Sequence, residues 1–196
     1  MPTCSNVPNQ PSGSSVIQEL LARITALEAE NHLLQHQVVT DELTGIYNRR
    51  GFNRVLNQEW RRCVRRQEPL SLILANVDHF KTYNESKGRT GGDMLLRDLA
   101  NMFIAISKRA GDSLARYGGD EFACILPSTD LEGATGLAET MRIRSNLSNV
   151  SISVGVASLV PGQEADPSAL VEAAETALRC ARSKGRNQVA VACASH

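Results

Sequence analysis

The sequence predicts an α/β domain, in which helices pack on a central sheet containing antiparallel strands, preceded by a coiled-coil helix. Three observations predict this arrangement. Residues 70–77 form a continuous apolar run of the kind that makes a buried central strand. The apolar runs 113–117 and 122–126 flank two glycines, which is typical of a hairpin. Between residues 17 and 38, apolar positions recur every three or four residues, as on one side of a helix.

The composition limits the partners and the setting of the chain. Its 196 residues suffice for one domain and an extension, and Lys+Arg balance Asp+Glu at 21 each, so no overall field attracts nucleic acid or a membrane. The five cysteines form no Cys-x-x-Cys pair, and their odd number argues against a disulfide framework. No apolar run approaches membrane-spanning length, and the N-terminus lacks the basic and apolar parts of a signal peptide. We therefore expect a cytoplasmic protein with no nucleic-acid or membrane partner.

The chain divides into four parts. Residues 1–14 are mainly Ser, Pro, Asn and Gln, with little to bury, and are expected to be disordered. Ser15 and Gln18 form a capping box that starts a helix over residues 15–39. The domain itself covers residues 40–192, and residues 193–196 are a tail.

The N-terminal helix has the heptad pattern of a parallel two-stranded coiled coil. Isoleucine recurs at position a, leucine recurs at position d, and Asn31 occupies one a position. Such a helix would make the protein a homodimer and would also offer a surface to a regulatory protein. The alternative is an amphipathic helix that packs on its own domain, because Leu21 and Leu33 widen the apolar stripe.

The remaining elements follow in order. Residues 40–52 predict a turn leading into a helix that runs toward Arg66, with Trp60 on its buried side. After the strand at 70–77, Asp93 is expected to open a helix over 94–109, and the hairpin comes next. Helices at 131–145 and 167–184, the last stopped by Gly185, and strands at 151–158 and 187–192 complete the order β-α-β-β-α-β followed by α-β.

The hairpin carries two adjacent carboxylates, Asp120 and Glu121, directly after its glycines. They would repel each other unless a cation or hydrogen-bond donors lay opposite. Oxygen ligands on a rigid turn suit Mg²⁺, which takes one or two carboxylates and completes its shell with phosphate oxygens. The two glycines are expected to adopt the positive φ that tight hairpin turns require. For Gly-Gly-Asp alone, the alternative is a solvated polar turn.

The end of the strand at 70–77 predicts a nucleotide site. The chain passes there from strand to helix, where backbone N–H groups favour phosphate and Lys81 adds a positive charge. Farther along, Asn84 and Asp93 offer amide and carboxylate partners for a base edge, and the donors and acceptor of guanine are a good match. Asp93 has a second interpretation, as the cap of its own helix.

Two further groups of charged residues have an ordinary interpretation when they are taken by themselves. Arg109 and Asp112, three residues apart at a helix end, would form a surface ion pair of little energetic value. Arg182, Lys184 and Arg186 close the last helix, where they would compensate the helix dipole.

Residues 116–122, Arg-Tyr-Gly-Gly-Asp-Glu-Phe, resemble the signature of the GGDEF domain family, the diguanylate cyclases. Residues 41–50 are similar to the opening motif of that family, with Ile46 where Leu is usual, and residues 181–188 resemble its closing motif. Five motifs in the right order cover residues 41 to about 192. The resemblance implies a fold akin to ferredoxin-like folds and nucleotide cyclase palms. It also implies an enzyme that condenses two GTP molecules into cyclic di-GMP and releases pyrophosphate.

The resemblance implies roles for individual residues as well. The enzyme would need Mg²⁺ or Mn²⁺, would act as a homodimer because each protomer holds one GTP, and would be inhibited by its product. The implied catalytic residues are Asp120 and Glu121, and the implied metal ligands are Asn76, the carbonyl of Val77, Asp120 and Glu121. Product inhibition would use Arg109 and Asp112, with a further contact from Arg142 or Arg144. The implied substrate contacts are Leu43, His79, Phe80, Lys81, Asn84, Asp93, Gly118, Gly119, Arg182 and Arg186.

One departure from the family pattern touches the chemistry. Asn76 stands where the family usually has a metal-binding Asp. An amide oxygen can bind Mg²⁺, but one negative charge is lost from a site that must hold metal on a triphosphate. The alternative function is therefore a catalytically weak or inactive GGDEF protein that acts as a receptor for GTP or cyclic di-GMP through a partner. Smaller departures are Glu85, where Asp is common, and Arg182, where Lys is usual.

Overall fold

The structure is a computed structural model that describes residues 17–18, 20–25, 39–107, 109, 111–162 and 166–192. The chain forms two compact units, Met1–Val38 and Val39–His196. In the first unit, the described residues are helical and exposed, including Ile17 and Ile24. The coiled coil was predicted over residues 15–39. Apart from these helical residues and Val39, which begins the second unit, that segment lies outside the described residues, and so do both predicted tails. The coiled-coil dimer therefore stays a prediction.

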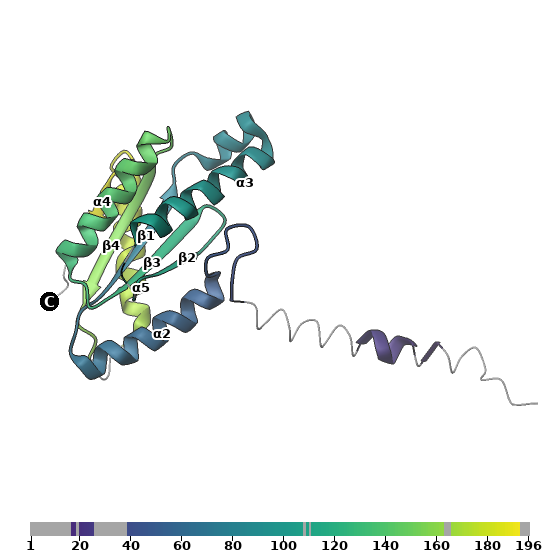
Figure 1. Cartoon of the computed structure of the whole chain (residues 1–196), viewed down its shortest axis with the longest axis horizontal. Coiled ribbons are helices and arrows are strands. Elements are labelled where there is room, and N and C mark those ends of the chain that lie inside the picture. The colour runs from purple at the N-terminus through teal and green to yellow at the C-terminus, as the bar shows by residue number, and fades with distance from the viewer. Residues whose placement is uncertain are drawn as a thin grey trace, which may run out of the picture. The chain divides into compact units, whose positions relative to one another are not determined.

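The second unit has the predicted order of elements (Figure 1). A five-stranded sheet has the strand order β2-β3-β1-β4-β5, in which only β4 and β5 pair in parallel. The mixed sheet with flanking helices confirms the predicted fold class. The elements are α2 (Arg49–Arg66), β1 (Leu70–Val77), α3 (Phe80–Ile106), β2 (Ser113–Arg116), β3 (Glu121–Pro127), α4 (Leu131–Leu147), β4 (Ile152–Leu159), α5 (Pro167–Ser183) and β5 (Val189–Val191).

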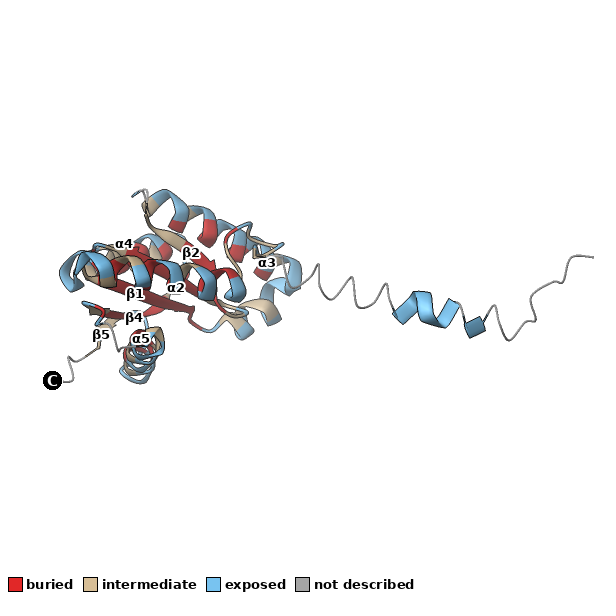
Figure 2. Ribbon diagram, turned by 90° about the horizontal axis from the view of Figure 1, so that it is seen from below, coloured by how far each residue is buried: buried red, intermediate tan, exposed pale blue. Residues whose placement is uncertain are grey.

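Helices cover both faces of the sheet, and strand β1 is therefore buried on each side. Its alternate residues Ile73, Ala75 and Val77 pack in one core with α3 and α4. Leu70, Leu72 and Leu74 pack in the other core with α2 and α5. Figure 2 shows the buried residues gathered in the sheet and on the helix sides that face it, with exposed residues on the outer helix sides. Within the described residues, no helix is long and apolar enough to cross a membrane.

Helix α3 corrects the prediction that Asp93 opens a helix. The span Phe80–Ile106 consists of two helical halves that meet at a kink at Gly88, whose φ of 73° is not helical. A straight helix would place residues 84 and 92 about 12 Å apart. Here a Cβ on Gly92 would lie 1.8 Å from the Asn84 Oδ1 atom, so the two halves turn back on each other at Gly88. Asp93 thus lies inside the second half and caps nothing.

The hairpin turn also differs from its predicted conformation. Strands β2 and β3 pair as expected, and the backbone N–H groups of Tyr117 and Gly118 both donate to the carbonyl of Glu121, at 2.8 and 3.2 Å. Neither Gly118 nor Gly119 has a positive φ, however. A Cβ on Gly118 would lie 2.8 Å from the Glu121 Oε2 atom, so a side chain there would displace the Glu121 carboxylate.

Candidate nucleotide and metal site

The predicted acidic residues meet at the end of strand β1. In the sheet register, Asn76 lies opposite Glu121 on β3, and the backbone N–H of Val77 donates to the carbonyl of Asp120 at 3.1 Å. Asn76 is buried, with 6% of its surface exposed. Burial raises the pKa of Glu121, the neighbouring Asp120 carboxylate raises it further, and Arg182 opposes the change. The site thus concentrates negative charge that a cation would neutralise.

Arg116 braces the hairpin turn that carries these carboxylates. Its Nη2 and Nε atoms donate to the carbonyl of Gly119 at 2.7 and 3.0 Å. Its Nη1 atom lies 3.3 Å from both carboxylate oxygens of Asp41. Burial alone would raise the pKa of Asp41, but hydrogen bonds from Thr44 and the charge of Arg116 outweigh it and hold that pKa below its ordinary value. One side chain therefore joins the opening motif to the turn before Asp120.

The opening motif extends the edge of the sheet. Tyr47 forms a parallel bridge to Ala115 on the edge strand β2, with its N–H donating to the carbonyl of Leu114 at 3.1 Å. The carbonyl of Leu43 accepts a hydrogen bond from the Nε atom of Arg97 on α3 at 3.2 Å. These contacts fix the segment before α2 against both β2 and α3. They place Leu43, a predicted substrate contact, beside the second half of α3.

The start of helix α3 retains the features of a phosphate site. His79 precedes the helix in a left-handed conformation, with φ of 56°, and its side chain makes no capping hydrogen bond. The first N–H groups of a helix have no partner within the helix, so they favour an anion. Lys81 is exposed in this first turn, and Phe80 is half-buried and packs on the core beneath it.

Asn84 has the one buried side-chain N or O atom without a hydrogen-bond partner among the described residues, its Oδ1. An unpaired buried acceptor costs about 1–3 kcal/mol, so such an atom indicates a missing donor. It lies against Gly92, next to the exposed Asp93. The bend at Gly88 thus brings the two predicted guanine-reading side chains to neighbouring positions, although they are nine residues apart in the chain.

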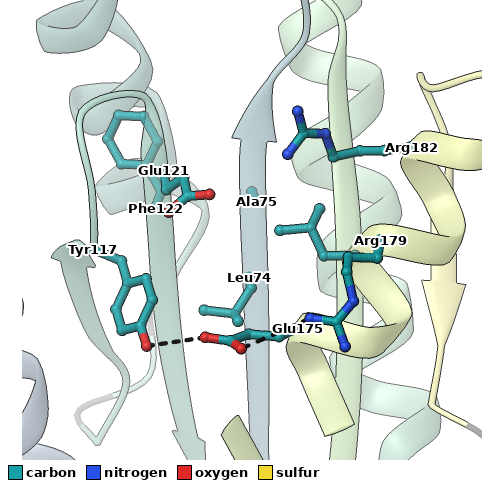
Figure 3. A pocket seen from close by; sticks show the side chains of 9 residues that line it. Leu74, Ala75, Tyr117, Glu121, Phe122, Glu175, Arg179 and Arg182 are labelled. Carbon is teal, nitrogen blue, oxygen red and sulfur yellow. Dashed lines mark hydrogen bonds and ion pairs between the residues drawn. The ribbon is translucent and has the colours of Figure 1, made fainter. Parts of the chain in front are cut away.

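Helix α5 forms the other wall of the site. Figure 3 shows Glu121 and Arg182 extending toward each other across a cavity of about 130 Å³. Deeper in the cavity, the Tyr117 hydroxyl donates to the Glu175 carboxylate at 3.3 Å, and that carboxylate also pairs with Arg179 at 4.0 Å. Arg186, the second predicted phosphate contact on this side, is exposed in the turn between α5 and β5.

The predicted inhibitory pair lies at the other end of the sheet. Arg109 donates to the Thr129 hydroxyl at 3.4 Å, and Thr129 in turn is joined to Ser71 near the start of β1. Burial raises the pKa of Asp112, and no ion pair joins it to Arg109 in the part of the chain described. Arg142 pairs with Glu139 at 2.8 Å and also donates to Asn187 beyond the far end of β1, while Arg144 is exposed. Which arginine completes the inhibitory site stays a prediction.

Several contacts in the site were not predicted from the sequence. Asp41 and Arg116 each belong to a motif, but 75 residues separate them, and only the bridge from Tyr47 to β2 brings them together. Glu175 belongs to no recognised motif, and the ring of Tyr117 that it contacts also stacks under Arg49, whose guanidinium lies 4.4 Å from the ring centre. The spacing of Glu175 from Arg179 and Arg182, one and two helical turns later on the same helix, is the pattern that could have indicated its place in the site.

The residues at the end of β1 fit a divalent cation. The donors that the register gathers are the amide of Asn76 and the carboxylates of Asp120 and Glu121, all oxygen ligands that suit Mg²⁺ or Mn²⁺. Among the described residues, no group of three or more His, Cys, Asp and Glu side chains could hold a metal by itself. A cation here would therefore complete its shell with oxygens from the amide, the backbone and a bound phosphate.

Known proteins share this fold and sequence. The family description "Diguanylate cyclase, GGDEF domain" matches residues 38–188. The Response regulator PleD of Caulobacter vibrioides is 35% identical over 193 residues, which cover 88% of this chain and 42% of PleD. Diguanylate cyclase DgcM of Escherichia coli is 31% identical over 186 residues, which cover 92% of this chain and 45% of DgcM. The chain thus spans less than half the length of either relative.

Solved structures of GGDEF proteins share the fold of this chain. The GGDEF domain of DgcB from Caulobacter crescentus, in complex with c-di-GMP, has a TM-score of 0.73 and 28% identity, covering 79% of this chain and 93% of that one. Diguanylate cyclase SiaD from Pseudomonas aeruginosa, in complex with its activator SiaC, has a TM-score of 0.72 and 29% identity, covering 89% of this chain and 72% of that one. With the signature on the hairpin and the site at the end of β1, the chain belongs to the GGDEF family of diguanylate cyclase domains.

Proposed function

We propose that the protein is a diguanylate cyclase, which condenses two GTP molecules into cyclic di-GMP and releases two pyrophosphates. The observation that carries this proposal is the register that places Asp120 and Glu121 beside Asn76, directly before the uncapped start of α3. Carboxylates for a cation and N–H groups for phosphate then lie together, as phosphoryl transfer requires. The unpaired Oδ1 of Asn84 supports guanosine as the nucleoside.

The chain's own residues would hold one GTP in an extended position. The N–H groups at the start of α3 and the side chain of Lys81 would bind the β- and γ-phosphates, with Arg182 and Arg186 closing from the α5 side. Asn84 and Asp93 would pair with the donors on the guanine edge. Leu43, Gly118 and Gly119 would line the path between base and phosphates. No atom lies within 4 Å of the position that a Cβ on Gly119 would take, so a ligand could approach the backbone there closely.

The cation would be held by Asn76, the carbonyl of Val77, Asp120 and Glu121. When bound, Mg²⁺ or Mn²⁺ neutralises charge that develops on the phosphoryl oxygens. In each half-reaction, the 3′-oxygen of one GTP forms a bond to the α-phosphorus of the other, the bond from that phosphorus to the bridging oxygen breaks, and pyrophosphate leaves. We assign Glu121 a role as ligand or as acceptor of the hydroxyl proton.

One domain binds one GTP, so the ring closes only when two domains face each other. We propose a homodimer for this reason, with the heptad pattern of residues 17–38 as the device that keeps two chains at high effective concentration. The same helix offers a place for a regulatory protein, which fits the activator complex of the relative SiaD.

The test is incubation of the full chain with GTP and either Mg²⁺ or Mn²⁺, followed by chromatographic analysis of the products. Cyclic di-GMP and two equivalents of pyrophosphate are expected, with activity per chain falling on dilution as dimers dissociate. Absence of any cyclic product with both metals, at protein concentrations where light scattering shows dimers, would overturn the enzymatic function.

Asn76 supports a second candidate function, a receptor that binds GTP or cyclic di-GMP without turnover, and one substitution separates the two. Asn76→Asp should lower the Mg²⁺ concentration for half-maximal activity about tenfold, because restoring one charge strengthens a cation site by about 1.4 kcal/mol or more. Without metal, the third carboxylate should lower the melting temperature, since it adds repulsion beside Asp120 and Glu121. Asn101→Asp, at an exposed position of α3, is the matched control. If wild type and Asn76→Asp both bind GTP and neither turns it over, the receptor function replaces the enzyme.

Product inhibition is the second property to be tested by a variant. Arg109→Ala should weaken cyclic di-GMP binding about tenfold or more, because a charge-assisted hydrogen bond is worth about 1.5–3 kcal/mol. GTP binding should not change, since Arg109 lies at the opposite end of β1 from the nucleotide site. Calorimetry with both ligands measures this, and Arg65→Ala, an exposed arginine at the end of α2, is the control. Equal product affinity in wild type and Arg109→Ala would reduce this residue to a surface contact.

A further inference from the structure

Asp78, the acidic residue directly after strand β1, forms hydrogen bonds inside the protein with both of its carboxylate oxygens. It is buried, with 7% of its surface exposed. Its Oδ1 atom accepts a hydrogen bond from the Ser153 hydroxyl at 2.7 Å, and its Oδ2 atom accepts one from the backbone N–H of Asn187 at 3.0 Å. These two bonds connect the end of β1 to β4 and to the turn before β5.

The partner of Asp78 belongs to a strained turn. Arg186 and Asn187 are consecutive residues with left-handed backbones, at φ of 64° and 47°; asparagine tolerates this conformation, whereas arginine rarely adopts it. Such conformations persist only where the surroundings hold them. Here the Asn187 amide oxygen accepts from Asn146 at 2.8 Å and from Arg142 at 3.3 Å, and the N–H of Arg186 donates to Ala181 at 3.1 Å.

Asp78 also stands at the start of the phosphate site. It immediately precedes His79, the left-handed residue that begins α3, and its own N–H donates to the carbonyl of Ser151 at 2.9 Å. Its carboxylate thus joins the start of α3 to the turn at 185–188, although Asp78 and Asn187 are 109 residues apart in the chain. Arg186 and Asn187 are both exposed in that turn, and Arg186 is its cationic side chain.

We infer that Asp78 is a positioning residue: through the Asn187 N–H it holds the strained turn so that Arg186 and the start of α3 bind the same triphosphate. This inference deepens the proposed function and rests on it. Without the carboxylate, two consecutive left-handed residues would lose the acceptor that fixes one of them, and the turn would relax. Arg186 would then reach the phosphates from many orientations, and the ordering it needs on binding would weaken the contact.

The test is a double-mutant cycle read by calorimetric binding of a non-hydrolysable GTP analogue in the presence of Mg²⁺. Asp78→Ala and Arg186→Ala should each weaken binding about tenfold, and the double variant should bind no more weakly than Arg186→Ala alone. Guanosine, which has no phosphate, should bind equally to all four proteins. Ser153→Ala is the matched control, because it removes the other partner of Asp78 and leaves the bond to Asn187; it should change affinity less than threefold.

A second measurement does not depend on nucleotide. The Asn187 amide of the wild-type protein should exchange slowly with solvent deuterium, and Asp78→Ala, which removes the acceptor of that N–H, should accelerate the exchange at least tenfold while Ser153→Ala does not. Additive losses of affinity in the double variant, or unchanged exchange at Asn187, would overturn the inference while the enzyme remained. If the wild-type protein bound no GTP analogue, the proposed function would fall and this role for Asp78 with it.

Discussion

Replacing Asp120 by alanine should lower the rate of cyclic di-GMP formation about a thousandfold or more. Asn76 contributes no charge, so Asp120 and Glu121 are the two carboxylates that the register brings to the end of β1. Stabilisation of phosphoryl charge by a bound cation is worth several kcal/mol, and about 4 kcal/mol corresponds to a thousandfold. Initial rates of pyrophosphate release at saturating GTP, titrated with Mg²⁺ and with Mn²⁺, measure the effect.

The Asp120→Ala variant should nonetheless fold. The contact that the hairpin makes through this residue uses its backbone carbonyl, which accepts from the Val77 N–H, and alanine keeps that carbonyl. Since the Asp120 carboxylate raises the pKa of Glu121, removing it relieves repulsion, and the melting temperature without metal should stay the same or rise. Asp98→Ala, at an exposed position of α3, is the matched control. Turnover within tenfold of wild type in the folded Asp120 variant would remove this residue from the metal site.

The sequence predicted the parts of the fold that local patterns determine. The bounds of strand β1 were predicted to the residue, because a mainly apolar run between Pro69 and Asp78 leaves little choice. Helix α2 was predicted as well, as a helix running toward Arg66 with Trp60 on its buried side, and the structure adds Asn48 as its cap, accepting from the N–H groups of Arg50 and Gly51. The prediction for α3 was wrong in where its second half starts, because that half begins after the non-helical Gly88 and not at Asp93.

The site was predicted less completely, for a physical reason. Asn76, Asp120 and Glu121 belong to recognised motifs and lie at the same end of the neighbouring strands β1 and β3, so strand pairing brings them together. The bonds from Arg116 to Asp41 and from Asp78 to Asn187 instead join segments 75 and 109 residues apart. Such contacts depend on the complete strand order, which the packing of two cores fixes and no local pattern reveals. The contacts that support a site are therefore harder to predict from the sequence than the residues of the site itself.

Replacing Gly92 by alanine should weaken GTP binding about tenfold or more without unfolding the domain. The new Cβ would lie 1.8 Å from the Asn84 Oδ1 atom and 3.1 Å from the Phe80 ring, so the Asn84 side chain must rotate away. That atom is the end of a flexible side chain, and alanine favours a helix by up to about 1 kcal/mol over glycine, so stability should change little. The lost guanine contact is worth about 1–1.5 kcal/mol, or about tenfold in affinity.

The selectivity of the Gly92→Ala variant between GTP and ATP tells whether displacement of Asn84 causes the loss of affinity. If Asn84 reads the guanine edge, the variant should lose affinity for GTP far more than for ATP, and Asn84→Ala with Gly92→Ala should bind no more weakly than Asn84→Ala alone. Gly136→Ala on α4 is the matched control, because nothing lies within 4 Å of its added Cβ, and it should leave affinity for GTP unchanged. Equal losses for GTP and ATP in Gly92→Ala would mean that the bend of α3 is distorted and that Asn84 does not select the base. Wild-type affinity for GTP would mean that the buried amide takes no part in binding.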